Sequence, residues 1–108
     1  MTKIIFSEQF VKQLNELQDY ITDVYQAPLT ALKTRNNIER HIQKLIFKPE
    51  LGIKLKQVIP QIADEYKLHR RLLINRYVLI FHYDKKQNTL YIDALFHQTQ
   101  NYLSLFSE

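Results

Sequence analysis

A chain of 108 residues is long enough to bury one hydrophobic core but not two, so we expect a single domain over residues 1–108. Hydrophobic residues make up 45% of the chain, which excludes disorder, and the lack of cysteine excludes disulfide frameworks and thiolate zinc sites. Fifteen lysines and arginines against eleven acidic residues give a net charge of +4, which favours a polyanion or an acidic partner.

The sequence contains no stretch that approaches a membrane span, and it suggests no membrane partner. Its first ten residues, MTKIIFSEQF, lack the long apolar run and the small-residue cleavage site of a signal peptide. No internal repeat or low-complexity tract divides the chain. Together with the absence of cysteine, these features predict a soluble cytoplasmic protein.

The first half of the chain predicts a strand followed by two helices. KIIF at residues 3–6 is short, apolar and rich in β-branched residues, as is typical of a buried strand. Ser7 then suits the N-cap of an amphipathic helix that should end near Gln26. Pro28 ends this helix or opens a second one, which the proline and glycine of KPELG at residues 48–52 terminate. The short turn between the two helices makes them an antiparallel hairpin.

The second half predicts a connector followed by three strands. Residues 53–68 follow no clear period: IKLKQV alternates as a strand does, a proline interrupts it, and QIADEYK suits a helical turn. RRLLI, YVLIFHYD and TLYIDALFH then read as strands joined by a two-residue turn at residues 75–76 and a four-residue turn at residues 85–88. These strands form an antiparallel meander.

The two turns predict the register of the meander. Leu72 should face Leu79, Phe81 should face Ile92, and Leu79 should also face Ala94. One face is then almost wholly apolar and should lie under the helices: it carries Leu72, Ile74, Tyr77, Leu79, Phe81, Leu90, Ile92, Ala94 and Phe96. The other face carries His69, Arg71, His82, Tyr91, Asp93 and His97, interleaved with Leu73, Val78, Ile80 and Leu95.

The polar face has an ordinary and a functional interpretation. An antiparallel sheet often turns one side to water, and such a side needs no function. Lysine, threonine, serine and glutamate would be usual there, whereas histidine, arginine and tyrosine titrate near neutrality, hold phosphates and stack on bases. We therefore favour a functional site. Metal binding is a weaker alternative, because no histidine pair has helical spacing, and no cofactor is expected.

Five segments in this order resemble the RelE/ParE toxin superfamily over nearly the whole chain. They are DYI at residues 19–21, Ala31, KLIFKPELG at 44–52, RRLLINRYVLIFHY at 70–83 and FHQTQNY at 96–102. The resemblance implies an α+β fold. In it, an N-terminal strand precedes an antiparallel helical hairpin packed on one face of a mostly antiparallel four-stranded sheet, and a short helical tail ends the chain.

The resemblance also implies a function, that of the toxin in a bacterial type II toxin–antitoxin module that inhibits growth. Its partner would be a cognate antitoxin that wraps an extended or helical tail over it, and it would reach operator DNA only through that antitoxin. The free toxin would expose an apolar patch beside the polar residues, and the antitoxin would cover it. The patch would consist of Leu73, Val78, Ile80 and Leu95.

RelE-like members of the superfamily cleave ribosome-bound mRNA, and this is the activity that the sequence favours. Metal-independent cleavage needs a base for the 2′-hydroxyl, cations for the phosphate and an acid for the leaving oxygen. Arg71 is our candidate cation, and His82 and His97 are candidates for the base and the acid. Tyr102 matches the family's C-terminal aromatic residue. The candidates for RNA or phosphate binding are Lys54, Lys56, His69 and Tyr91.

Two departures from the RelE-like pattern keep other functions open. Val78 stands where those nucleases commonly have an arginine, and HQTQ at residues 97–100 stands where they carry a basic residue. The first alternative is a ParE-like poison of DNA gyrase, which does not require these residues and has a long helical hairpin. The second is an interaction module whose polar face only docks a partner.

Overall fold

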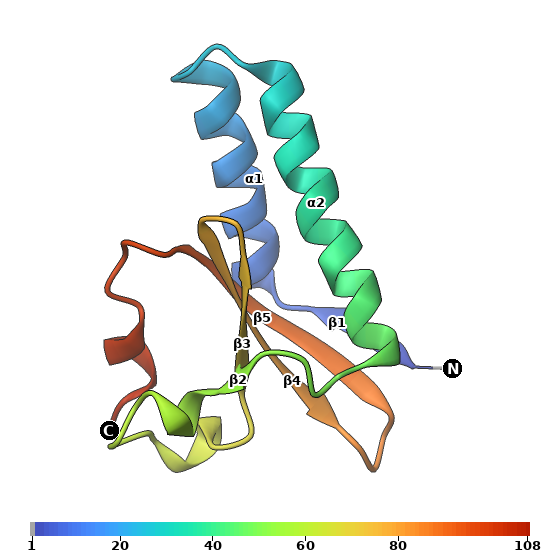
Figure 1. Cartoon of the computed structure of the whole chain (residues 1–108), viewed down its shortest axis with the longest axis vertical. Helices are drawn as coiled ribbons and strands as arrows, with labels where there is room; N and C mark the ends of the chain where they lie inside the picture. The colour runs from blue at the N-terminus through green and yellow to red at the C-terminus, as the bar shows by residue number, and fades with distance from the viewer. Residues whose placement is uncertain (1) are drawn as a thin grey trace.

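Two helices cover one face of a five-stranded sheet in the computed structural model, which describes residues 2–108 (Figure 1). The strands lie in the order β1 (Lys3–Phe6), β5 (Thr89–His97), β4 (Tyr77–Asp84), β3 (Arg70–Ile74) and β2 (Ile53–Lys54). β1 runs parallel to β5, and the other neighbours are antiparallel. The α+β fold is confirmed, with a fifth strand in place of the four expected, because two residues of the connector pair with β3.

Helices α1 (Glu8–Asp23) and α2 (Pro28–Phe47) form the expected antiparallel hairpin, whose connected end projects beyond the sheet (Figure 1). Ser7 caps α1, because its Oγ accepts a hydrogen bond from Phe10 N at 2.9 Å. Pro28 opens α2, where the missing N–H costs no helical hydrogen bond. Among the described residues, no helix is both long enough and apolar enough to cross a membrane.

The connector and the C-terminal tail pack against each other beside the sheet. The connector contains two short 3₁₀ helices, η1 (Leu55–Gln57) and η2 (Asp64–Tyr66), the second of which is the helical turn expected in QIADEYK. The tail ends in a third, η3 (Leu103–Phe106). Ala63 N donates a hydrogen bond to Phe106 O at 3.0 Å, which holds the tail along the connector.

A β-bulge in β5 decides which side chains face the helices. Phe81 pairs with Ile92 as predicted, but Ile80 pairs with Ala94, so Asp93 is an extra residue in the ladder. Leu79 then pairs with Leu95, and the prediction that it faces Ala94 is wrong. Side chains alternate between the two faces of a strand, so one extra residue reverses the alternation beyond it.

The first hydrophobic core lies between the helices and the sheet. It buries Phe10, Leu14, Ile38, Ile42, Leu45, Ile74, Leu79, Phe81, Leu90, Ile92 and Leu95. The prediction also placed Ala94 and Phe96 here, and this is wrong, because the bulge turns both to the opposite face. Leu95, which was expected on the polar face, takes their place.

The second hydrophobic core lies on the opposite face, between the sheet and the connector and tail. It buries Leu55, Ile59, Ile62, Val78, Ile80, Ala94, Phe96, Tyr102 and Phe106. The predicted apolar patch is therefore wrong, since Val78, Ile80 and Leu95 are all buried and only Leu73 is exposed. Much of the face expected to meet an antitoxin is covered by the chain itself.

The bulge is held in place by α1. Ser7 Oγ, besides capping α1, donates a hydrogen bond to Asp93 O at 2.6 Å, and Ser7 N donates to Ile92 O at 3.0 Å. Leu95 N donates to Gln13 Oε1 at 2.7 Å. Backbone groups at the bulge thus find partners on the helix.

We expect Ser7→Ala to lower the free energy of unfolding by about 1–3 kcal/mol, because it removes both the helix cap and the bond to Asp93. Urea denaturation of the purified chain measures this change. Ser104→Ala, which removes a hydroxyl from an exposed position in the tail, is the matched control and should cost less than about 0.5 kcal/mol. Equal losses in the two variants would show that Ser7 does not support the bulge.

Candidate functional site

The structure divides the predicted site residues among separate places instead of gathering them on one face. One group surrounds Asp93 on the side of the sheet away from the helices: His69, His82 and Tyr91. Arg71 and Tyr102 form a second group, and His97 lies apart from both. Lys54 and Lys56 lie on β2 and η1 at the far edge of the sheet.

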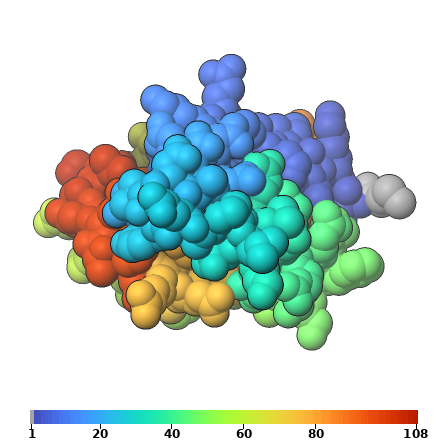
Figure 2. Space-filling model, turned by 90° about the horizontal axis from the view of Figure 1, so that it is seen from above, coloured from blue at the N-terminus to red at the C-terminus, as the bar shows by residue number. Residues whose placement is uncertain are grey.

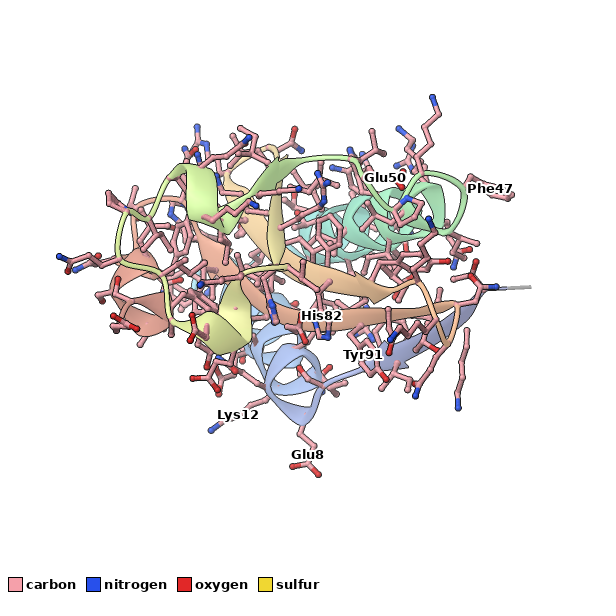
Figure 3. All side chains as sticks on the ribbon, turned by 90° about the horizontal axis from the view of Figure 1, so that it is seen from below. Glu8, Lys12, Phe47, Glu50, His82 and Tyr91 are labelled. Carbon is pink, nitrogen blue, oxygen red and sulfur yellow. The ribbon has the colours of Figure 1, made fainter. Side chains whose placement is uncertain are left out.

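The group around Asp93 is a stack of rings above a carboxylate. His82 Nδ1 donates a hydrogen bond to Asp93 Oδ2 at 2.6 Å, and His69 Nε2 lies 3.4 Å from the same oxygen. The two imidazole rings are stacked with centroids 4.2 Å apart, and Tyr91 stacks on His82 at 4.6 Å. Figure 3 labels His82 and Tyr91, which lie close together beside β4 and β5.

Strand pairing and the bulge bring this group together. His69 directly precedes β3, and its place continues the register in which Arg70 pairs with Phe81, so it meets His82. Tyr91 is the direct partner of His82 on β5. Asp93 is the bulged residue, and its side chain turns toward the histidines.

Burial controls the charge of His69. Its removal from water lowers its pKa to about 4, although the nearby Asp93 carboxylate opposes the shift. The ring is therefore neutral at pH 7. Its Nδ1 is buried without a hydrogen-bond partner among residues 2–108, so it is held by packing rather than by polar contacts on that side.

Arg71 and Tyr102 belong to the edge of the second core. Arg71 Nη1 donates a hydrogen bond to the Tyr102 hydroxyl at 2.7 Å, while its Nε is buried without a partner in the described part of the chain. The Tyr102 ring is 5% exposed and stacks on Phe96, with centroids 5.4 Å apart. This arrangement anchors the tail to β3 and leaves the Tyr102 ring no open face for an RNA base.

His97 lies on the helix side of the sheet, so the prediction that it shares a face with Arg71 and His82 is wrong. The bulge four residues earlier reverses its direction. Its ring meets Tyr77 edge-on at 5.5 Å, and Thr99 N donates a hydrogen bond to its Nδ1 at 3.2 Å.

His97 lines a groove of about 740 Å³ between the helical hairpin, the β3–β4 turn and the start of the tail. In Figure 2 the hairpin end faces the viewer between the red C-terminal segment and the yellow-orange turn. Three tyrosines also line this groove, Tyr20, Tyr25 and Tyr77. Burial raises the pKa of Tyr77, which keeps its hydroxyl protonated. No sequence motif singled out these tyrosines as site residues.

Lys54 and Lys56 do not lie beside Arg71 on one face of the sheet. Lys54 pairs with Arg70, whose other partner Phe81 points into the core under the helices. Lys54 therefore lies on the helix side, whereas Arg71 points to the opposite side. Lys56 is exposed on η1. A single phosphate-binding cluster of Arg71 with both lysines is not formed.

Asp93 was expected on the polar face without a role of its own, and it lies at the centre of the site. A carboxylate inside an otherwise apolar strand was the available signal. His69, His82 and Asp93 each offer a ligand atom, and these atoms lie within 4.8 Å of one another. Within residues 2–108 this is the group whose composition suits a metal ion.

A family model described as the ParE toxin of the type II toxin–antitoxin system, parDE, matches residues 4–102. The chain belongs to the ParE toxin family. It is thus a toxin of a type II toxin–antitoxin system, and the resemblance to the RelE/ParE superfamily is confirmed. A search of curated proteins finds no match.

Solved structures share the fold of this ParE-family chain at low sequence identity. The chromosomal ParDE system from P. aeruginosa matches with a TM-score of 0.68 and 16% identity, covering 90% of this chain and 96% of that one. The intact E. coli RelBE toxin–antitoxin complex matches with a TM-score of 0.58 and 8% identity, covering 94% and 100%. The isolated E. coli RelE toxin matches with 0.59 and 7%, covering 97% and 93%.

We expect Tyr102→Phe to lower the free energy of unfolding by about 1–3 kcal/mol, because the ring still packs but the Arg71 guanidinium loses its partner. Urea denaturation measures the loss. Tyr25→Phe removes the same hydroxyl from an exposed ring and should change stability by less than about 0.5 kcal/mol. A loss no larger than that of the control would mean that the Arg71–Tyr102 bond does not hold the tail.

Proposed function

We propose that this ParE-family toxin inhibits growth by binding DNA gyrase. The separation of the RNA-cleavage candidates is the observation that favours this target. A nuclease must bring its cation, base and acid to one phosphate. Here His97 lies across the sheet from His82, and Tyr102 is buried against Arg71. A toxin that acts by binding a protein does not need these groups together.

The free end of the helical hairpin is a suitable surface for binding a protein. It projects beyond the sheet (Figure 1) and carries exposed large side chains at Tyr20, Val24, Tyr25, Leu29 and Leu32. Exposed apolar and aromatic side chains gathered on one part of a small protein mark a contact surface. Because the second core covers much of the other face, we propose the hairpin end as the surface that meets the target.

We further propose that a cognate antitoxin covers the hairpin end and the groove beside it. The P. aeruginosa ParDE system and the E. coli RelBE complex are toxin–antitoxin systems with the same fold. The net charge of +4 favours an acidic antitoxin, and contact with operator DNA would run through that antitoxin.

Ribosome-dependent mRNA cleavage is the second candidate. The pair of His82 and Asp93 favours it, because both side chains are partly exposed and a histidine hydrogen-bonded to a carboxylate can act as a general base. This candidate requires Arg71 and His97 to reach the same phosphate from different faces. A non-catalytic interaction module is the third, in which case expression would not inhibit growth.

Inducible expression in bacteria distinguishes these functions when protein synthesis and the DNA-damage response are followed separately. We expect induction of the DNA-damage response before any fall in amino-acid incorporation. Early loss of amino-acid incorporation without DNA damage would instead support mRNA cleavage. Absence of any growth effect from a chain shown to be folded would support the interaction module.

We expect Leu29→Glu to relieve growth inhibition while the chain stays folded. Leu29 is 74% exposed at the hairpin end, and a carboxylate in the first turn of α2 suits the helix dipole. Colony counts after induction measure toxicity, and circular dichroism with urea denaturation checks the fold.

Leu68→Glu makes the same substitution at a leucine that is 73% exposed in the connector, and it should leave toxicity unchanged. His97→Ala and Arg71→Ala should also remain toxic if their folds are retained. Relief by these two substitutions, with none from Leu29→Glu, would contradict gyrase binding through the hairpin end and would support RNA cleavage.

A further inference from the structure

Three side chains converge beside the bulge with the composition of a metal site. His69 and His82 offer imidazole nitrogens, and Asp93 offers a carboxylate oxygen. We propose that this trio binds a divalent transition-metal ion of the Zn²⁺ class. The proposal concerns a site apart from the hairpin end and does not depend on which target the toxin acts upon.

The spacing of the ligand atoms fits such an ion. Ligands at about 2.0–2.2 Å from a tetrahedral zinc lie about 3.3 Å from one another. Here His69 Nε2 and His82 Nδ1 lie 3.4 and 2.6 Å from the same oxygen of Asp93, and all the ligand atoms lie within 4.8 Å of one another. These separations are close to those between the ligands of a bound ion.

The identity of the ligands points to the same class of ion. Two imidazoles and one carboxylate form the protein ligand set of several open zinc and iron(II) sites, in which water takes the remaining positions. Magnesium and calcium prefer sites made mostly of oxygen. The side chains of His82 and Asp93 are 28% and 24% exposed, so an ion and its water can enter from solvent.

The surroundings hold the ligands in place before any ion arrives. Ser7 anchors the backbone of Asp93 through its bond to the carbonyl oxygen. Tyr91 stacks on the His82 ring, and Tyr66 meets the His69 ring edge-on at 5.2 Å. Preorganised ligands lose less entropy on binding, which favours a specific site over weak surface binding.

A simple hydrogen-bonded pair of His82 and Asp93 does not account for His69. This residue is 9% exposed, and its Nε2 points at the Asp93 carboxylate from 3.4 Å, which is long for a hydrogen bond. An ion bound between Nε2 and the carboxylate would give this nitrogen a partner. An ion here would link the start of β3 to β4 and β5.

Titration of the purified full-length chain with Zn²⁺, after removal of metals with a chelator, tests the proposal. Isothermal calorimetry should show binding of one ion per chain. Co²⁺ in place of Zn²⁺ should give the visible absorption of a low-symmetry site with nitrogen ligands. Zn²⁺ should also raise the midpoint of thermal unfolding, since it binds the folded chain.

His82→Gln and Asp93→Asn each remove one ligand at a partly exposed position, and circular dichroism checks that both variants are folded. Each should weaken Zn²⁺ binding by at least about 100-fold, because loss even of residues that support a ligand costs 10–100-fold. His41→Gln is the matched control. It removes an imidazole on α2 that bonds the Asn37 carbonyl, and it should bind Zn²⁺ as the parent does.

Two results would overturn the proposal. One is an absence of stoichiometric Zn²⁺ binding to the parent chain. The other is binding that His82→Gln and Asp93→Asn leave unchanged, which would place the ion elsewhere. In both cases the trio is a hydrogen-bonded polar cluster on the face of the sheet away from the helices, and the thermal shift on adding Zn²⁺ should be the same in all variants.

Discussion

The bulge at Asp93 is the local constraint on which the rest of the structure depends. By adding one residue to β5, it turns Leu95 toward the helices and Ala94 and Phe96 toward the opposite face. Without it, the first core would contain Ala94 where it now contains the larger Leu95. The bulge stays in place because α1 supplies the hydrogen bonds that the ladder lacks, from Ser7 and Gln13. A single serine thus couples the start of a helix to the register of a strand more than eighty residues away.

The second core determines which surfaces of the toxin remain exposed for a partner. The connector and tail fold across the face away from the helices and bury the apolar side chains there, those of Val78, Ile80, Ala94 and Phe96. Burying these apolar side chains is favourable, and Arg71 and Tyr102 are drawn into the edge of that layer. The free end of the hairpin remains exposed and carries large apolar and aromatic side chains. This arrangement supports the proposal that the toxin acts by binding a protein.

The same bulge places the histidines in two different environments on opposite faces of the sheet. His97 moves to the groove beside the hairpin, among tyrosines, whereas His82 stays across the sheet with His69 and Asp93. The second environment is partly buried, and removal from water lowers the pKa of His69 far below its ordinary value although the Asp93 carboxylate opposes the shift. The two imidazoles and the carboxylate together suit a metal ion. Neither environment resembles the open cationic surface that a phosphate-binding site requires.

The sequence by itself determined the cap at Ser7, the hairpin, the order of the meander strands and its turns, because these follow from local periodicity and turn chemistry. Its resemblance to a known superfamily implied the fold class. The sequence also determined that histidines and Asp93 lie among apolar residues. Only the tertiary structure decided that Asp93 bulges, that His97 changes face, and that the connector and tail bury the second face. The alternation of β5 does not reveal the bulge, because Ala94, Leu95 and Phe96 beyond it are all apolar and either register buries hydrophobic side chains. Hydrogen bonds from Ser7 and Gln13 stabilise the bulged register. Local sequence pattern does not reveal them, because both residues lie far from β5 in the chain.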